Sequence, residues 1–335
     1  MKAAKHFLIL ISLVSLLSCN NNKLKIDVSD INLSLKIQRF DSVLYNIKTD
    51  SVINYVPDLQ KQYNEFFEIF NNKIINIGEP DQLAYSGYLT KFLTDNIIIE
   101  VLEKVNKEFS DFSNYSSELE LAFKHYKYYY QEKPIPNIYT YVSGFNQSIV
   151  TTENILGIGL DKYLGENSEY YKQLGIPAYL RYKMTKSRIV PDCMTAWALQ
   201  EFNYNDSTDN LLNRMIYNGK IMYFLDAVLP SYEDSIKIGY KTSQIAWCKA
   251  NEKDIWTYIV ENKLLFNSEF INIKKMIDDA PNTSFFPQNS PSRTGVWIGW
   301  QIVKSYMKNN QEVTLQELMK SSDYQKILNY SKYKP

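Results

Sequence analysis

The chain is poor in the residues that usually hold catalytic metals. Its 335 residues include two histidines, His6 and His125, and three cysteines, Cys19, Cys193 and Cys248. A catalytic zinc ion usually needs two or more histidines, or one histidine together with two thiolates. Because His6 lies in an N-terminal segment that we expect to be removed, the mature protein keeps a single imidazole. The sequence therefore predicts no metal site.

The chain also lacks the short motifs of nucleotide, calcium and nucleophile sites. Neither G-x-x-x-x-G-K-[ST] nor G-x-G-x-x-G occurs, and the G-x-S-x-G elbow and the D-x-D-x-D-G loop are absent. The Gly-Ile-Gly that opens residues 157–165 has no third glycine at the required spacing, so close strand packing is its expected use. These absences predict no cofactor and disfavour an enzyme.

A strong net charge and a second long apolar run are missing as well. The 37 basic and 37 acidic residues balance, and removal of residues 1–18 takes away two lysines. Such a near-neutral chain has no electrostatic basis for binding nucleic acid.

Cys193 and Cys248 are too few for a disulfide framework. The sequence allows either one disulfide bridge between them or two buried free thiols. With 45% hydrophobic residues, the chain can bury a substantial core.

The N-terminus has the pattern of a bacterial lipoprotein signal. Two lysines precede the apolar residues 7–17, a segment too short to span a bilayer comfortably. Ser18, a small residue, comes directly before Cys19, which is the arrangement that lipid attachment requires. We predict a signal peptide over 1–18, acylation at Cys19, palmitate included, and a lipidated tether over 19–33 that anchors the protein to a membrane.

Apolar periodicity predicts an α+β protein that is predominantly helical, with a small central β-meander. Residues 34–335 are expected to form a single domain, because no internal repeat or long linker divides them. We expect an N-terminal strand and helices over 34–135, the β-meander over 137–165 and a helical part over 175–335. The expected helices are 52–70 (with a break at Pro57), 82–109, 118–130, 193–202, 210–229, 252–264, 268–279, 294–308 and 314–328, and the expected strands are 35–44, 138–142, 147–150 and 155–160.

Six ordered stretches resemble the gliding-motility-associated lipoprotein B family (GldB) of Bacteroidetes. The resemblance covers nearly all of the mature chain, and the lipoprotein signal agrees with it. The stretches are "IQRFD" (37–41), "ILGIGLDKYLG" (155–165), "GIPAYLRYKM" (175–184), "IVPDCMTAWALQEF" (189–202), "LLNRMIYNGKIMYFLDAVLP" (211–230) and "SPSRTGVWIGWQIVKSYM" (290–307).

This resemblance implies a part in gliding motility, in support of the cell-surface adhesin machinery and its linked protein secretion. It implies a lipid-anchored protein of the cell envelope whose partners are other gliding or secretion proteins of the envelope. The residues after Cys19 are Asn20, Asn21, Asn22 and Lys23, without the acidic pattern of exported lipoproteins. By analogy with other lipoproteins of these bacteria, the protein is expected to face the periplasm, from the inner or the outer membrane.

The family is in turn similar to predicted zinc peptidases of the gluzincin type. There, an H-E-x-x-H helix places two ligands one turn apart with a water-polarising Glu between them, and a second helix supplies a third ligand from Glu-Gly-x-x-x-Tyr-Phe. In this chain "DCMTAWALQEF" (192–202), with Asp192 as the expected N-cap, holds the place of the first helix. "NGKIMYF" (218–224) holds the place of the second. The first helix has no histidine and Asn218 replaces the glutamate, so the resemblance implies a zincin-like scaffold without its metal ligands.

The resemblance thus implies a pseudo-peptidase with a degenerate metal site. Its residues would be Trp197, Leu199, Asn218 and Gly219, and Trp197 and Leu199 would fill the vacated space. We expect no catalytic residue and no metal ligand there.

A cleft at the same place could still bind a ligand without cleaving it. Asp161, Arg181 and Arg293 are the candidate polar contacts, although buried Arg and Asp more often pair within the structure. The preferred function is a non-enzymatic envelope lipoprotein required for gliding. One alternative is a glycan- or peptide-binding envelope lipoprotein, for which the 27 Tyr and 5 Trp supply aromatic surface. The other is an active hydrolase that uses a pair of carboxylic acids, as glycosidases do, which the sequence pattern does not reveal.

Overall fold

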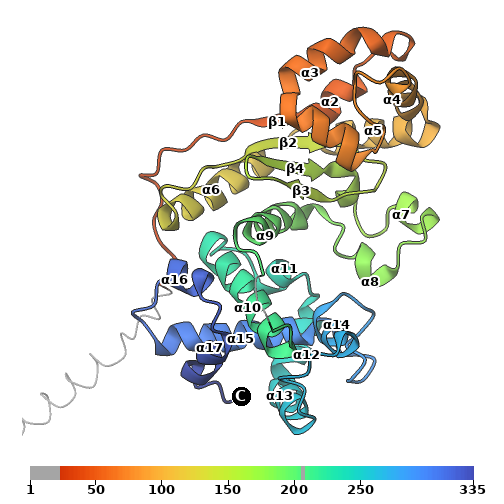
Figure 1. Cartoon of the computed structure of the whole chain (residues 1–335). Coiled ribbons are helices and arrows are strands. Elements are labelled where there is room, and N and C mark those ends of the chain that lie inside the picture. Colours follow the sequence, from red (N-terminus) through yellow and green to blue (C-terminus); the bar gives the residue numbers. More distant parts are fainter. Residues whose placement is uncertain (1–22, 205–207) are drawn as a thin grey trace, which may run out of the picture.

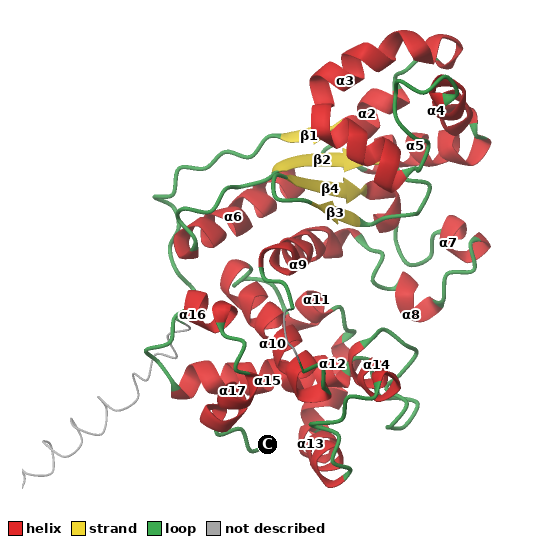
Figure 2. Ribbon diagram, viewed as in Figure 1, coloured by secondary structure: helices red, strands yellow, loops and turns green. Residues whose placement is uncertain are grey.

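The computed structural model describes residues 23–204 and 208–335. Residues 1–22, which include Cys19 and the predicted signal peptide, lie outside the described residues. The expected fold class is confirmed: the described part is α+β and predominantly helical, with one four-stranded sheet (Figures 1 and 2). A continuous cluster of buried apolar side chains extends from Phe40 to Ile327.

The strands are β1 (Ile37–Arg39), β2 (Asn137–Tyr141), β3 (Ile149–Thr151) and β4 (Ile155–Gly159). The helices are α2 (Phe40–Tyr45), α3 (Val52–Ile69), α4 (Tyr85–Thr94), α5 (Asn96–Glu108), α6 (Ser113–Tyr129), α7 (Glu169–Gln173), α8 (Ala178–Arg181), α9 (Ile189–Glu201), α10 (Leu211–Val228), α11 (Asp234–Ile238), α12 (Thr242–Ala250), α13 (Glu252–Glu261), α14 (Phe270–Ile277), α15 (Thr294–Asn309), α16 (Leu315–Lys320) and α17 (Tyr324–Ser331). Short 3-10 or π segments are η1 (Thr49–Ser51), η2 (Phe70–Ile74), η3 (Leu160–Tyr163) and η4 (Lys186–Arg188).

The sheet is not the expected meander. Its order is β1-β2-β4-β3, with β1 and β4 parallel to β2 and only β3 antiparallel to its neighbour β4. Every residue of β4 is buried, whereas β3 is half-buried throughout, so β4 suits the interior of the sheet and β3 its edge. The glycines of β4 allow close packing as predicted, because a Cβ on Gly159 would lie 2.2 Å from the carbonyl oxygen of Gln147.

The N-terminal strand is shorter than the expected 35–44. After Arg39 the chain turns into α2, because Phe40 and Leu44, one helical turn apart, both point into the core. Phe40 makes edge contacts with four aromatic rings of α3 and η2, Phe66 among them. Buried Asp41 pairs with Arg39 at 2.7 Å and accepts a short hydrogen bond from Thr140, which ties α2 to β2.

Several expected helices have different limits. Residues 82–109 form two helices, because the Asp95 carboxylate accepts from the amides of Ile97 and Ile98 and starts α5 as an N-cap. The expected break of α3 at Pro57 is wrong, since the helix continues through it and deviates at Asn64 instead. The expected helix 314–328 divides into α16 and α17.

Helices cover both faces of the sheet (Figure 1). On one face α3 packs through Phe66, whose ring stacks on Tyr139 of β2 at a centroid distance of 4.2 Å. On the other face lies α9, which contacts β3 and β4. Beyond α9, the long helices α10 and α15 cross each other and the remaining C-terminal helices surround them.

Candidate functional site

The first helix of the expected metal site, α9, begins at Ile189 rather than at residue 193. Asp192 therefore lies in the first turn and is not the N-cap. Its carboxylate forms an ion pair with Arg188 and accepts a 3.0 Å hydrogen bond from the Tyr163 hydroxyl. Pro191 is tolerated because first-turn amides have no partner within the helix. These contacts tie the start of α9 to η3 and η4.

Aromatic rings fill the space between α6, α9 and α10. Trp197 is fully buried and lies edge-on to Phe123 and Tyr126, at centroid distances of 6.2 and 6.3 Å. Phe224 of α10 approaches Tyr126 to 6.2 Å. Trp197 thus has the packing role expected of it. The same expectation for Leu199 is wrong: its side chain is 42% exposed, because it lies on the solvent side of α9.

Of the ionisable groups near this aromatic cluster, Glu201 forms structural contacts, whereas the buried Nδ1 of His125 has no hydrogen-bond partner in the described structure. Glu201 accepts from the Tyr126 hydroxyl at 3.2 Å and pairs with Lys133 at 2.8 Å. His125 is buried on α6, and burial lowers the pKa of its imidazole. Within residues 23–204 and 208–335, no group of three His, Cys, Asp or Glu could hold a metal ion. Cys193 and Cys248 are both buried and unpaired.

Asn218 and Gly219 serve the packing of α10. The Asn218 amide donates to the carbonyl oxygen of Arg214, one turn earlier, at 2.8 Å. Gly219 meets Gly299 where α10 crosses α15: a Cβ on Gly219 would lie 2.3 Å from the carbonyl of Gly299, and one on Gly299 would lie 1.8 Å from the carbonyl oxygen of Met215. No side chain fits at either position, so the glycine of "NGKIMYF" is required by this helix crossing.

The candidate cleft residues Asp161, Arg181 and Arg293 lie on η3, on α8 and directly before α15. No hydrogen bond or ion pair joins any two of these three described side chains. Arg293 donates to the carbonyl oxygen of Ile238 at the end of α11 and lies 3.9 Å from Asp279. Arg181 has a buried Nε without a hydrogen-bond partner.

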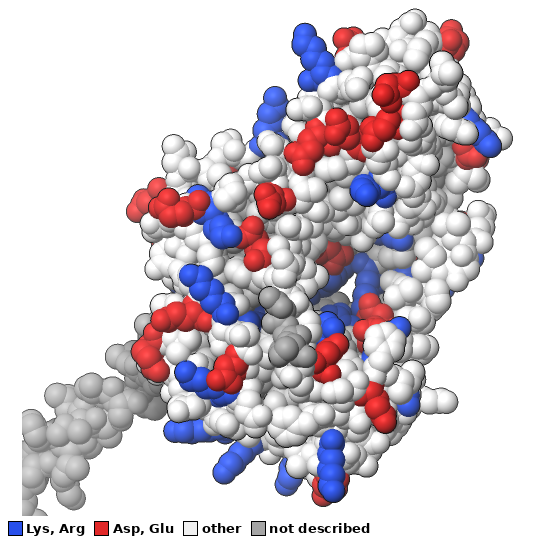
Figure 3. All heavy atoms as spheres, in the orientation of Figure 1, with Lys and Arg blue, Asp and Glu red and all other residues white. Residues whose placement is uncertain are grey.

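A small group of cations surrounds the end of α11. Arg188 donates to the carbonyls of Ile236 and Lys237 at the C-terminal end of α11, where carbonyl groups lack the usual amide partners of a helix. Lys183 pairs with Asp279, and burial, helped by nearby Arg293, lowers the pKa of Lys183 to about 8. Figure 3 shows Lys and Arg atoms in a hollow in this part of the surface. Arg188 and Arg293 bond to carbonyl groups at the end of α11, so these two cations hold α11 in place.

Asp161 organises the loop between β2 and β3. Its buried carboxylate accepts from the amide of Phe145 at 2.6 Å, and from the amide and hydroxyl of Ser143 at 3.0 and 3.1 Å. Burial raises the pKa of Asp161, and these hydrogen bonds oppose the rise. Gly144 and Phe145 both have positive φ angles, a conformation that the Asp161 contacts hold. Asp161 is therefore a structural residue of this loop.

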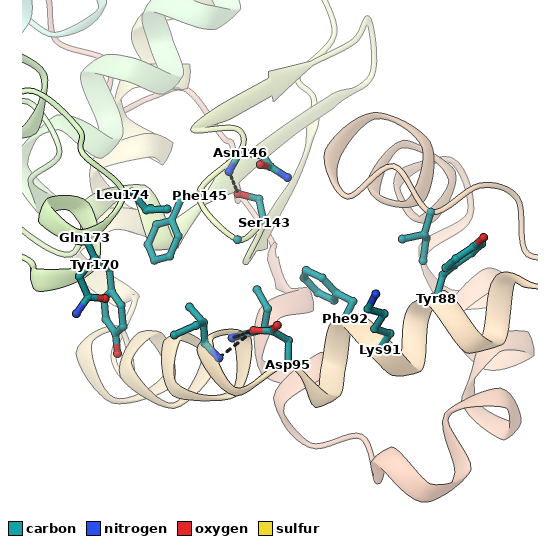
Figure 4. A pocket seen from close by; sticks show the side chains of 14 residues that line it. Tyr88, Lys91, Phe92, Asp95, Ser143, Phe145, Asn146, Tyr170, Gln173 and Leu174 are labelled. Atoms are coloured by element: carbon teal, nitrogen blue, oxygen red, sulfur yellow. Dashed lines mark hydrogen bonds between the residues drawn. The ribbon is translucent and has the colours of Figure 1, made fainter.

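This loop forms one wall of an open cavity of about 520 Å³ (Figure 4). The other walls come from α4, the start of α5 and α7. The apolar lining residues are Ile77, Tyr88, Phe92, Ile97, Ile98, Phe145, Tyr170 and Leu174, and the polar ones are Lys91, Asp95, Ser143, Asn146 and Gln173. Ligand sites are mostly apolar cavities of this size, so this cavity is the candidate binding site.

No pattern in the sequence points to this cavity. Its walls come from segments 77–98, 143–146 and 170–174, none of which carries a recognisable motif. The available signal is exposure, which only the structure reveals: Tyr88, Ile97 and Leu174 are 53%, 46% and 55% exposed. Large apolar side chains exposed together often mark interaction sites.

Comparison with known proteins identifies the family. The model of the family described as "Gliding motility protein GldB" matches residues 21–335. No curated protein and no solved structure matches the chain. No helix of the described residues is long and apolar enough to cross a membrane. Because the family model covers almost the whole chain, the protein belongs to the GldB family of lipoproteins implicated in gliding motility.

Proposed function

We propose that this protein is a non-enzymatic lipoprotein of the cell envelope that supports the surface adhesin machinery of gliding and its linked secretion. It is anchored through lipid on Cys19, faces the periplasm and acts by binding other envelope proteins of the machinery. Membership in a family of gliding lipoproteins supports a role of the protein in gliding at the cell envelope. The lipoprotein signal around Cys19 supports the lipid anchor.

The observation that carries the non-enzymatic role is the packing between α9 and α10. The resemblance to zinc peptidases puts the metal beside these two helices, and there Trp197, Tyr126 and Phe224 pack against one another. A substrate needs an open, polar site beside the reacting groups. An open, mostly apolar cavity lies among α4, α5 and α7, which suits binding.

The start of the described chain indicates which end of the protein lies nearest to the anchor. The Lys23 ammonium donates to the side chain of Gln311, between α15 and α16, at 3.0 Å. Figure 1 shows that α16 lies far from α4 and α5. An anchor four residues before Lys23 would therefore keep the α16 side near the membrane, with the cavity helices α4 and α5 distant from that side.

Replacement of the lipidated cysteine tests the anchor and the role in gliding together. Cells that carry only the Cys19→Ser variant should release the protein from the membrane fraction and form non-spreading colonies. The Asn20→Ser variant keeps the cysteine and should behave as the wild type. Normal spreading of Cys19→Ser cells would contradict the proposed anchor.

Metal analysis tests the non-enzymatic role. The purified protein, dialysed against buffer without chelator, should contain far less than one zinc ion per chain. Tightly held, stoichiometric zinc would overturn the proposal, because an active metallohydrolase keeps its metal through such purification.

A further inference from the structure

We propose that the cavity among α4, α5, α7 and the 143–146 loop binds a peptide segment of an envelope partner protein. One large apolar side chain of the segment enters the cavity, and an acidic residue beside it faces Lys91. This inference rests on the proposed binding role and names the chemistry of the ligand.

The walls select an apolar side chain. Four aromatic rings, those of Tyr88, Phe92, Phe145 and Tyr170, line the cavity together with aliphatic residues. The rings of Phe145 and Tyr170 lie 5.7 Å apart at a tilt of 31°, which leaves faces and edges for a further ring. A volume of about 520 Å³ is ample for one aromatic or branched aliphatic side chain with its neighbours.

Three of the five polar side chains in the walls already form hydrogen bonds within the described protein, which leaves Lys91 and Gln173 for a ligand. Asp95 accepts from two amides of α5, Ser143 donates to Asp161, and the Asn146 amide donates to the carbonyl of Ile74 at 3.2 Å. A sugar, which carries a hydroxyl on nearly every carbon, would leave many of its groups unpaired here. The lining therefore favours an apolar side chain over a glycan.

The two charged side chains at the rim, Lys91 and Asp95, differ in how freely they can pair with a charge on a ligand. Within the described part of the chain, Lys91 forms no ion pair or hydrogen bond, and Figure 4 shows it beside Phe92 on the α4 wall. The nearby carboxylate of Asp95 is held at the N-terminus of α5, where the amides and the helix dipole offset its charge. The free charge at the rim is thus positive, which favours an acidic residue next to the entering side chain.

The wall opposite α4 is built in advance. Asp161 holds the backbone of Ser143 and Phe145, and the Tyr171 hydroxyl donates to the Asp161 carbonyl at 2.7 Å. A loop that is already ordered loses little entropy when a ligand binds. The exposed side chains of Tyr88, Ile97 and Leu174 form the edge that the partner would cover.

Fluorescence anisotropy with short fluorescein-labelled Gly-Ser peptides tests this proposal on the purified protein. The peptides carry Phe or Ser at the centre, next to either Glu or Lys. The Phe peptides should bind at least about tenfold more tightly than the Ser peptides, because burial of a Phe side chain is worth that much. The Phe-Glu peptide should bind about threefold more tightly than Phe-Lys, as expected for an exposed ion pair.

Two variants locate the binding. Leu174→Asp should weaken the Phe peptides about tenfold or more, and Lys91→Glu should reverse the order of Phe-Glu and Phe-Lys. Phe270→Asp, which changes another exposed apolar residue, on α14, should bind as the wild type does. All three positions are solvent-exposed, and circular dichroism checks that the variants fold.

Equal binding of Phe and Ser peptides, unchanged binding by Leu174→Asp, or an unreversed order in Lys91→Glu would each overturn the proposal. So would binding of dodecanoate, but of no peptide, that depends on Leu174, because the site would then take an acyl chain. These results are separate from colony spreading: a protein that binds no peptide but is required for gliding would refute the ligand class and leave the proposed function standing.

Discussion

Two regions of this molecule are rich in aromatic side chains and use them in opposite ways. Between α6, α9 and α10, Trp197, Tyr126 and Phe224 are buried completely and contact one another. At the cavity beside α4 and α7, Tyr88 is half exposed and the rings border open space. The residue types are similar, so composition does not distinguish core from binding site. What distinguishes the two regions is whether segments distant in the sequence pack against the rings.

The comparison is sharpest for the buried tryptophan. Trp197→Ala should lower the free energy of unfolding by about 3–5 kcal/mol, because it removes the largest side chain of the buried aromatic cluster and leaves a cavity. Leu199→Ala, two residues later on the exposed side of α9, should change it by about 0.5 kcal/mol or less. Urea unfolding followed by circular dichroism measures both. Similar losses for the two variants would contradict the assignment of faces on α9.

Replacement of glycine by alanine should also have different effects on stability at the crossing of α10 and α15 and at the cavity helix α4. Gly299→Ala should cost about 3 kcal/mol, since its Cβ would lie 1.8 Å from the carbonyl oxygen of Met215 and α10 and α15 must separate. Gly87→Ala on α4 adds a methyl group to open space and should stabilise the protein slightly, because alanine favours helix. Thermal unfolding distinguishes them; a tolerated Gly299→Ala would mean that the helix crossing is looser than the structure has it.

The parts of the fold that the sequence predicts well are those with local causes. Helices α10 and α15 lie within one residue of the expected limits, because α10 is a long apolar segment and the apolar residues of α15 repeat over four turns. The sequence predicts where the strands of the sheet lie but not how they pair, because strand order depends on contacts between segments far apart in the chain. The short helices α7, α8 and α11 lack enough turns to show a period.

The candidate site was predictable only in part, for a related reason. The lack of histidine led us to predict a degenerate metal site at α9 and α10, which stays a prediction, and the structure shows only that Trp197 is buried there. Asp161 and Arg293 were predicted to be ligand contacts, but both hydrogen-bond to backbone groups of other segments, at Ser143 and Phe145 and at the end of α11. A single sequence does not reveal which polar side chains the backbone will occupy. It also cannot bring together the three segments that form the cavity.

A buried charge in the packed region gives a pH-dependent prediction. Lys220, which follows Gly219 on α10, is buried and donates to the carbonyl of Ser321 at 2.7 Å, and burial lowers its pKa to about 8. An unfolded lysine titrates near 10.4. Between these two pKa values the unfolded chain binds more protons than the folded protein. The contribution of Lys220 to the free energy of unfolding therefore rises with pH.

The free energy of unfolding of the wild type, relative to a Lys220→Met variant without this titration, should therefore rise between pH 8 and pH 10. The rise should be about 1 kcal/mol per pH unit. Denaturant unfolding at several pH values measures the difference, and all other titrating groups are common to both proteins. A constant difference across this range would show that Lys220 keeps its proton and that α10 is less well shielded from water.

The smallest expected effect on stability lies at the cavity. Tyr88→Ala should change the free energy of unfolding by about 0.5 kcal/mol or less, because half of the side chain is already in water and it lies at the rim of open space. Yet the same change should weaken the Phe-Glu peptide severalfold, since the ring supplies one edge of the cavity. Binding that is lost while stability is kept marks a site that evolved to contact a partner. A large loss of stability in Tyr88→Ala would instead place this ring in the core, and the two aromatic regions would then serve the same purpose.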